Sequence, residues 1–426
     1  MRSVCIAYAD GCSRAETEIE LLGHYFAANG LTLKEKIEDA DLVLVSACGF
    51  DLCSEKTSMK LLRVAIKRKR EHAQFVVTGC LSAINPEIIT EAFGDHVLLF
   101  PPRRFKKLDT LISARVPFKE ILEKGNFPHG LVKTDVKLRL EQFASIVKTN
   151  QSYNLKAKKV FSSSERVMAA LFLTRTKVDD LIAHFPKCLK LQFIRQSHHL
   201  VPSLLLSRGC QGQCTYCGIP SAVGPLKSLP LERIVENFHS ILAQGNRVIG
   251  LVATDVGSYG QDIGSSVVEL FRRLFAFDED FQLIINDFNP RWLVEYSDDL
   301  INLFTANREK IDYVLMPIQS GSEKILSLMK RRHTAFEVQE QMLALKKAVP
   351  DFRIGTHVMV GFPGETEQDF NATLDFLKTI DFYYMKVFKY DDRPQIQSAR
   401  LPYKVPEKIK RKRLLKLIRE FHELVK

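Results

Sequence analysis

Three cysteines with short, regular spacing are the residues best suited to chemistry in this sequence. They are Cys210, Cys214 and Cys217, in the segment CQGQCTYC. A loop of this length can bring three thiolates to one corner of a cubic iron–sulfur cluster, because thiolates are soft ligands suited to iron and sulfide. Three ligands leave one iron open for a substrate. A zinc knuckle is the alternative, but the nearest downstream His, His239, falls in a predicted helix.

Three further cysteines are far apart in sequence but share one structural position. Cys12, Cys48 and Cys80 each follow a predicted strand, at its carboxyl end. In a parallel sheet these ends lie along one edge, where ligands bind. The three thiols are therefore expected to converge, as ligands of a second cluster or as buried thiols. Cys5, Cys53 and Cys188 do not share this position and are interpreted as structural.

The first hundred residues alternate between strand and helix patterns. Strands are predicted over 4–10, 41–47 and 74–79, and helices over 15–28 and 54–71. This alternation is typical of a doubly wound parallel sheet with helices on both faces. Residues 1–100 are therefore expected to form an N-terminal α/β domain.

Residues 101–199 have a different composition. The stretch 101–200 contains 20 Lys and Arg against 8 Asp and Glu, within a chain of net charge +11. Helices are predicted over 162–173 and 176–185, so this region is interpreted as a basic helical insert or linker. A basic segment favours a polyanionic partner. If the insert binds RNA, deletion of 130–195 is expected to abolish RNA binding.

The strand–helix alternation resumes in residues 200–426. Six strands are predicted, over 201–207, 247–254, 281–287, 313–319, 353–361 and 382–390. Six βα units favour a partial (β/α)6 barrel, whose sites lie at the carboxyl ends of the strands. The Cys210 loop directly follows the first of these strands, and the chain closes with a basic helix.

The triplet, with Tyr216 before its last cysteine, resembles the signature of the radical S-adenosylmethionine (SAM) superfamily. The resemblance implies a [4Fe–4S] cluster whose open iron binds SAM. One electron then cleaves SAM to a 5′-deoxyadenosyl radical, which takes hydrogen from an unactivated C–H bond. Tyr216 is expected to pack beside the cluster and to shield it from water.

The segments DGC, SAC and TGC around Cys12, Cys48 and Cys80, followed by the triplet, resemble the two-domain methylthiotransferases. Further similar segments are SLPLERIV, TDVGSYGQDIG, PIQSGSEKILSLMKR, VGFPGETEQDF and YDDRPQ. The resemblance implies a second [4Fe–4S] cluster on the first three cysteines, which supplies sulfur, and a second SAM, which supplies the methyl group. Within the family, the sequence is most similar to the enzymes that modify N6-threonylcarbamoyladenosine in tRNA.

The same resemblance suggests further residues that bind the cofactor. Asp255, at a strand end, is expected to contact SAM or to order the acceptor. Gly361 and Gly364 are expected to form a tight turn that lets the backbone approach SAM. Glu365 is expected to start the helix that follows. A turn residue or helix cap is the structural alternative for Asp255.

The sequence also departs from the family pattern. It ends on a helix, without the small C-terminal TRAM domain; Ala15 replaces an Asn, and Ala222-Val223-Gly224 replaces Ala-Arg-Gly. A tRNA is the expected acceptor, with a peptide or small molecule as the alternative and a non-catalytic paralogue as a third possibility. A reductant protein such as flavodoxin or ferredoxin is the expected partner. Without a signal peptide or an apolar run of about 18 residues, a cytoplasmic location without membrane contact is expected.

Overall fold

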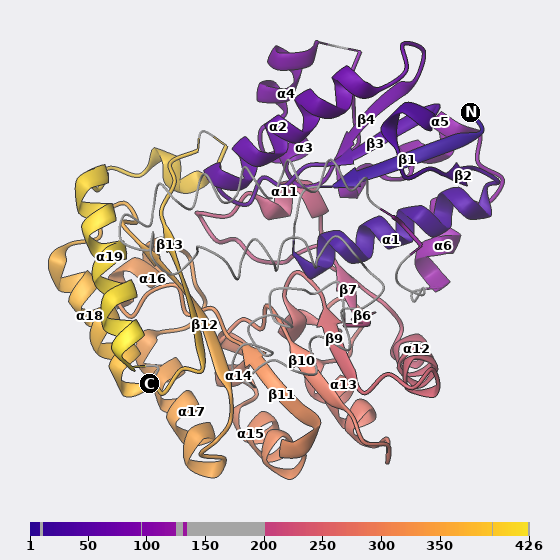
Figure 1. The fold of residues 1–426 in the computed structure, drawn as a ribbon. Coiled ribbons are helices and arrows are strands. Elements are labelled where there is room, and N and C mark those ends of the chain that lie inside the picture. Colours follow the sequence, from indigo (N-terminus) through magenta and orange to yellow (C-terminus); the bar gives the residue numbers. More distant parts are fainter. Residues whose placement is uncertain (9–11, 95, 125–130, 134–200, 394, 425–426) are drawn as a thin grey trace, which may run out of the picture. The chain divides into compact units, whose positions relative to one another are not determined.

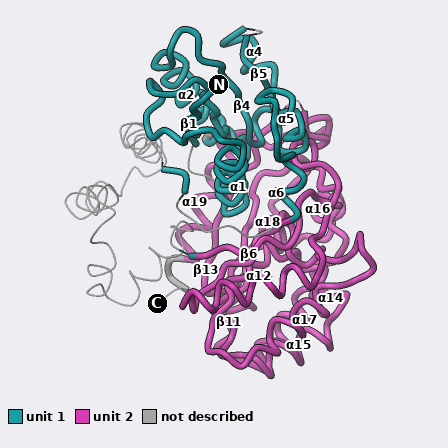
Figure 2. Tube along the Cα trace, turned by 90° about the vertical axis from the view of Figure 1, so that its right-hand side faces the viewer, with its two compact units in different colours: residues 1–123, 127–201 teal, residues 124–126, 202–426 magenta. Residues whose placement is uncertain are grey.

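The computed structural model describes residues 1–8, 12–94, 96–124, 131–133, 201–393 and 395–424. The chain divides into two compact units (Figure 2). The first comprises Met1–Glu123 and Phe127–Val201, and the second comprises Lys124–Asn126 and Pro202–Lys426. In the part of the chain described, no helix is long and apolar enough to cross a membrane. The helices predicted over 162–173 and 176–185 lie outside the described residues.

The first unit is built on a five-stranded parallel sheet with the order β2-β1-β3-β4-β5. Its strands are β1 (Ser3–Tyr8), β2 (Thr32–Leu33), β3 (Leu42–Ser46), β4 (Gln74–Thr78) and β5 (Leu98–Leu99). Its helices are α1 (Ser13–Ala28), α2 (Leu52–Arg68), α3 (Leu81–Ile84), α4 (Pro86–Phe93), α5 (Lys107–Ile112) and α6 (Phe118–Lys124). The three predicted strands are therefore confirmed. The two outer strands, of two residues each, are too short to produce an alternating sequence pattern.

Alternate residues of the central strands face opposite layers of helices. Ile6 on β1 and Leu44 on β3 pack in one hydrophobic cluster with side chains of α1. Cys5 and Val43 on the same strands pack in a second cluster with side chains of α2. Both sheet faces are thus covered, which confirms the doubly wound prediction. Cys5 is a core residue, as interpreted from the sequence.

The segment after residue 100 contributes to this same core. Five of its side chains are buried with the α1 cluster, namely Phe105, Leu108, Phe118, Ile121 and Val132. The Tyr25 hydroxyl on α1 donates a hydrogen bond of 2.8 Å to Asp109. The expected boundary at residue 100 therefore falls inside a continuous core, and residues 101–123 belong to the first unit.

The second unit contains six parallel strands in the order β13-β12-β11-β10-β9-β6, with helices along the outside (Figure 1). The strands are β6 (Ser203–Leu205), β9 (Val248–Val252), β10 (Gln282–Ile285), β11 (Ile311–Leu315), β12 (Ile354–Val360) and β13 (Tyr384–Lys389). The helices are α11 (Ile219–Val223), α12 (Leu231–Ala243), α13 (Val267–Phe275), α14 (Arg291–Glu295), α15 (Ser297–Ala306), α16 (Glu323–Leu328), α17 (Ala335–Ala348), α18 (Glu367–Thr379) and α19 (Glu407–Leu424). A small antiparallel pair joins β7 (Ser207–Arg208) to β8 (Lys227–Ser228). All six predicted barrel strands are confirmed.

The QSGS segment that follows β11 docks against α18. A Cβ at Gly321 would lie 2.8 Å from the Ala372 carbonyl oxygen, so only glycine permits this approach. Asp369 at the start of α18 accepts hydrogen bonds from the Ser322 hydroxyl (2.7 Å) and the Thr366 amide (2.8 Å). Lys324 forms an ion pair of 2.5 Å with the same carboxylate. These contacts fix α18 and the glycine turn before it.

Replacing Asp369 with Asn is expected to lower the free energy of unfolding by about 1–3 kcal/mol at pH 7. Burial raises the pKa of Asp369, but hydrogen bonds from Lys324, Thr366 and Ser322 outweigh it and lower the pKa to about 2. A depressed carboxyl pKa stabilises the fold above the unfolded value, and this stabilisation is lost as pH falls through the folded value. In urea titrations, the difference between D369N and wild type should therefore shrink between about pH 4 and pH 2. The exposed D375N variant on the same helix is the control; a difference independent of pH would contradict the assignment.

Candidate functional site

The three N-terminal cysteines lie at the carboxyl ends of neighbouring strands. Cys12 is the N-cap of α1 after β1, Cys48 follows β3, and Cys80 is the N-cap of α3 after β4. Since β3 pairs in parallel with both β1 and β4, all three cysteines lie at one edge of the sheet. Cys12 is exposed and Cys80 is buried, with Cys48 between these extremes.

Short backbone contacts hold Cys48 and Cys80 in place. Gly79 has φ +80°, and a Cβ there would lie 2.4 Å from the Ala47 carbonyl oxygen. The Leu81 amide donates to that same oxygen at 3.0 Å. The Cys48 amide donates to the Ser58 hydroxyl at 2.8 Å, and this hydroxyl donates back to the Cys48 carbonyl at 3.0 Å. The glycine of the TGC segment is therefore required for the close approach of two loops.

The N-terminal thiols are close enough to influence one another. Burial, together with the neighbouring Cys80 and Cys12, raises the pKa of Cys48 to about 12. Burial also raises the pKa of Cys80, whereas the Arg14 guanidinium lowers it. Arg14 Nη2 lies 3.0 Å from Cys80 Sγ, and both side chains are buried. The structure therefore brings the three predicted residues together, with one cation beside them.

Three thiols at one edge of the sheet are soft donors of the kind that bind iron–sulfur clusters. Among the described residues, no group of three or more His, Cys, Asp or Glu side chains is placed to hold one metal ion. In a cubic cluster each thiolate binds a different iron, so its ligands stand farther apart than those of a single ion. The buried Arg14 supplies positive charge that favours thiolates at this edge.

The cysteine triplet in the second unit lies in a loop that several segments anchor. Gly209 has φ +84°, and a Cβ there would lie 1.8 Å from the Pro225 carbonyl oxygen. The Gly212 amide donates to Cys210 Sγ at 3.1 Å. Thr215 donates through its amide to Met329 (3.1 Å) and through its hydroxyl to the Leu328 carbonyl (2.9 Å). The loop is thus attached to the segment that follows α16.

Arg331, partly buried beside the triplet, is a residue to which sequence analysis gave no role. Its Nη1 lies 3.8 Å from Cys214 Sγ and 3.4 Å from the Tyr216 hydroxyl. Its Nη2 donates to Asn289 Oδ1 (3.0 Å) and to the Pro317 carbonyl (2.8 Å). None of these hydrogen-bond partners is a carboxylate, and Nε has no partner among the described residues. A partly buried cation with no carboxylate among these partners suits an anionic ligand set of three thiolates.

Tyr216 has the position expected from the sequence, between the second and third cysteines. It packs against the apolar cluster of Met329, Phe362 and Tyr390. Burial raises the pKa of Tyr216 well above its usual value, so the phenol stays protonated and can donate a hydrogen bond. Its ring contributes to an apolar surface next to the triplet, consistent with the predicted shielding.

Asp255 follows β9 and lies near Cys210. It accepts hydrogen bonds from the Trp292 indole at 3.1 and 3.0 Å and from the Asn289 amide at 3.2 Å. Burial raises the pKa of Cys210 to about 11, and the carboxylate of Asp255 adds to this shift. The Arg291 guanidinium stacks on the Trp292 ring at 3.8 Å from its centroid. Asp255 thus lies at the strand ends where a ligand is expected.

His333 borders the same region and has no hydrogen-bond partner at either ring nitrogen among the described residues. Burial, together with the nearby Arg331 and Arg291, lowers its pKa to about 3. The imidazole is therefore neutral at physiological pH. It can donate or accept one hydrogen bond for a bound molecule.

Replacing Gly257 with Ala is expected to displace Trp292 and to lower the free energy of unfolding by about 1–3 kcal/mol. A Cβ at Gly257 would lie 2.1 Å from Cδ1 of Trp292, whose side chain is fully buried. Trp292 is the single tryptophan of the chain, so its fluorescence reports on this site alone. We expect the G257A emission to shift to longer wavelength. The G245A variant, at a glycine with φ +83° and open space around it, shows whether backbone strain without a steric contact changes the spectrum; an unchanged G257A spectrum would contradict the assigned contact.

The turn at Gly361 and Gly364 forms as expected, with φ of +77° and +85°. In the structure, side chains of α19 lie next to this turn. A Cβ at Gly361 would lie 2.4 Å from Cγ of Lys410 on α19. The Glu365 carboxylate accepts from the Gly361 amide and from Arg413 Nη1, both at 2.7 Å. The following helix begins at Glu367, after the N-cap Thr366, and so does not start at Glu365. The close approach at Gly361 is thus to α19, and a contact with SAM stays a prediction.

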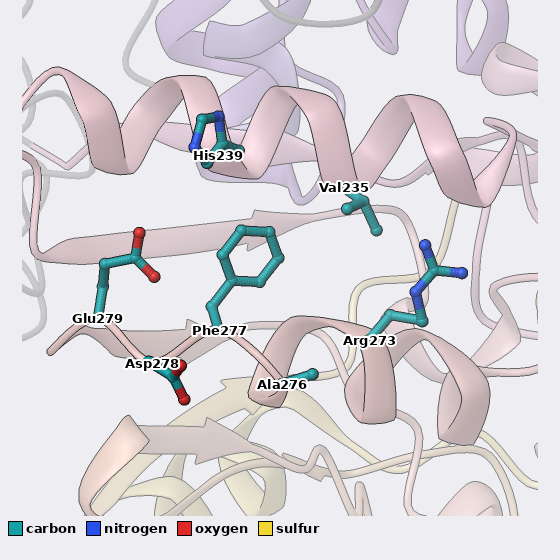
Figure 3. A pocket seen from close by; sticks show the side chains of 7 residues that line it. All are labelled: Val235, His239, Arg273, Ala276, Phe277, Asp278 and Glu279. Carbon is teal, nitrogen blue, oxygen red and sulfur yellow. The ribbon is translucent and has the colours of Figure 1, made fainter.

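A cavity of about 650 Å³ lies elsewhere in the second unit (Figure 3). It is lined by Val235, His239, Arg273, Ala276, Phe277, Asp278 and Glu279. These residues belong to α12, α13 and the loop before β10, at the amino end of that strand. Because sites in such folds lie at the carboxyl ends of the strands, the cysteine loop is the better candidate for chemistry.

Comparison with known proteins agrees with this geometry. Residues 204–377 match the Radical SAM superfamily, and residues 5–100 match the uncharacterized protein family UPF0004. A threonylcarbamoyladenosine tRNA methylthiotransferase of Aquifex aeolicus is 28% identical, over 95% of this chain and 84% of the relative. A ribosomal protein uS12 methylthiotransferase of Protochlamydia amoebophila is 25% identical, over 98% and 76%. The solved radical SAM methyltransferase TsrM from Kitasatospora setae has a similar fold, with TM-score 0.57 and 14% identity over 93% of this chain and 74% of TsrM.

The fold, the triplet after the first barrel strand and the matched domain define a radical SAM enzyme. The chain carries a radical SAM domain and a UPF0004 domain, and methylthiotransferase relatives cover most of its length, which confirms the resemblance found in the sequence. It is therefore a transferase, and its cofactors are SAM and [4Fe–4S] clusters, two of which the methylthiotransferase relatives carry.

Proposed function

We propose that this chain replaces a C–H bond of a tRNA adenosine with a C–S bond and methylates the sulfur. The observation that carries this proposal is the presence of two cysteine trios, each at strand ends and each beside an arginine that is buried or partly buried. Arg14 contacts Cys80 in the first unit, and Arg331 contacts Cys214 in the second. Such paired sites suit two clusters with three thiolate ligands each.

Each unit would hold one of the two clusters. Cys210, Cys214 and Cys217 would hold the cluster that supplies the electron for SAM cleavage, and Cys12, Cys48 and Cys80 the one that supplies sulfur. Arg331 fixes the triplet loop through Cys214 and Tyr216. Asp255 and the neutral His333 offer an acceptor and an uncommitted polar group to SAM or to the substrate. Tyr216 and its apolar neighbours reduce the access of water to the triplet.

Two features support a tRNA acceptor. A relative that matches this chain over 84% of the relative's length is a tRNA methylthiotransferase. The net charge of this chain is +11. Positive charge attracts phosphate backbones irrespective of sequence. Unpaired anticodon-loop bases can leave their stack and enter a closed site. A cytoplasmic location and a protein reductant are further parts of this proposal. The charged residues 134–200 lie outside the described structure.

The test is anaerobic incubation with SAM, dithionite and sulfide, using tRNA in one arm and an aspartate-containing peptide in the other. Digestion and mass spectrometry should show a methylthio group on a nucleoside of the tRNA and none on the peptide. A modified peptide with unmodified tRNA would instead support the second candidate, for which the similarity to the ribosomal protein methylthiotransferase is the evidence. Modification of neither, with SAM still cleaved, would contradict both acceptors.

A further inference from the structure

A charged pair is buried beside the N-terminal cysteines, at the start of α1. Arg14 and Glu18 are four residues apart on this helix, and Arg14 Nη1 lies 2.8 Å from Glu18 Oε2. Their side chains are only 6% and 9% exposed. Burial of two charges costs several kcal/mol per ion before their attraction is counted, and well-packed apolar residues are often no worse for stability. Fold stability alone therefore does not explain why two charges are buried here.

The geometry of Arg14 directs part of its charge toward sulfur. Its Nη2 lies 3.0 Å from Cys80 Sγ, in a contact that spans 66 residues of sequence. Arg14 thus divides its two terminal nitrogens between a carboxylate and a thiol. A guanidinium does not lose its proton in proteins, so this N–H donor and its charge are permanent.

We propose that Arg14 is a positioning residue that holds the Cys80 thiolate and raises the reduction potential of the cluster at Cys12, Cys48 and Cys80. This inference rests on the proposed function, which assigns a cluster to these cysteines. Hydrogen bonds to the sulfurs and nearby charge are established controls of cluster potential. Reduction by one electron adds negative charge to the cluster, and the buried cation stabilises that added charge. Glu18 acts in the opposite sense, because it offsets part of the charge of Arg14.

If the pair tunes the cluster, substitutions of Arg14 and Glu18 should change the reduction potential in opposite directions, which a purely structural role would not produce. Removal of Arg14 should make the cluster harder to reduce, and removal of the Glu18 charge should make it easier. A pair that only holds α1 in place would lose stability in both variants and leave the potential unchanged.

The experiment uses the full chain with Cys210, Cys214 and Cys217 replaced by Ala, so that any remaining cluster is the N-terminal one. Iron and sulfide are measured after anaerobic reconstitution, and the midpoint potential is measured by dithionite titration with electron paramagnetic resonance. R14M should retain iron and favour the oxidised state at least tenfold, a shift of 59 mV for one electron toward negative potential. E18Q should shift the potential in the positive direction. R14K keeps the charge without the planar donor pair and should fall between R14M and the parent.

Potentials of R14M and E18Q that both match the parent, or that shift in the same direction, would overturn the inference. If R14M does not fold, as judged by circular dichroism, the signs of the E18Q and R14K shifts decide by the same criterion. A parent protein without iron would instead refute the cluster itself, and so the proposed function. The two failures are therefore distinguishable.

Discussion

Replacement of Cys12, Cys48 and Cys80 by Ala is expected to abolish methylthio transfer while SAM is still cleaved. The variant should contain about four irons per chain, against about eight in the reconstituted wild type. The reason is the separation of the two trios between two compact units, each with hydrophobic clusters of its own. Loss of the ligands in the first unit leaves the anchored loop in the second unit unchanged.

The measurement combines iron analysis with chromatography of 5′-deoxyadenosine and mass spectrometry of the acceptor. The matched control is C5A, which removes a buried thiol on β1 that belongs to the hydrophobic core. C5A should keep both iron content and transfer, with a small loss of stability. A triple variant that still transfers the methylthio group would show that the sulfur comes from elsewhere.

Replacement of Arg331 by Met is expected to reduce SAM cleavage at least a hundredfold, equivalent to about 2.7 kcal/mol. The guanidinium connects Cys214, Tyr216, Asn289 and Pro317, so its loss frees the triplet loop and leaves partly buried acceptors without this donor. Such orphaned acceptors cost about 1–3 kcal/mol each in stability. Reductive cleavage depends on the placement of the cluster, and it should therefore fall more than folding stability does.

The control for this variant is R332M, since Arg332 is the next residue and is exposed. R332M should cleave SAM at the wild-type rate. R331K tests whether charge alone is sufficient; we expect only partial recovery, because an ammonium cannot reproduce the planar set of donors. Equal cleavage rates in R331M and R332M would contradict a role for Arg331 at the triplet.

The strand ends that position the cysteines could be predicted from sequence because a simple rule connects them. Each of Cys12, Cys48 and Cys80 follows an apolar run, and neighbouring parallel strands share one carboxyl edge. The structure has β1, β3 and β4 as neighbours in that order. The strands of two residues, β2 and β5, leave no comparable pattern and were not foreseen.

The contacts of Arg14 and Arg331 with the cysteines could not be predicted from the strand pattern. Arg331 is 117 residues from Cys214, and Arg14 is 66 residues from Cys80. Such contacts depend on tertiary packing, and no local pattern separates these arginines from exposed ones such as Arg332. The one available signal was the position of Arg14, two residues after a candidate ligand and four before Glu18.

The residues expected to contact SAM show the limits of motif reading. Asp255 lies at a strand end as expected, but its main partner is Trp292, 37 residues away. The turn at Gly361 fits the predicted backbone, although Lys410 from α19 fills the space next to it. A positive φ is a local property that sequence can indicate, whereas the neighbour of a glycine depends on the whole fold.

The content of iron and acid-labile sulfide after anaerobic reconstitution tests the central claim most directly. Two trios of thiolates should yield about eight irons and about eight sulfides per chain, falling to about four of each when either trio is replaced. About four irons in the wild type, unchanged by loss of Cys12, Cys48 and Cys80, would show that the first unit holds no cluster and would contradict its role as sulfur donor.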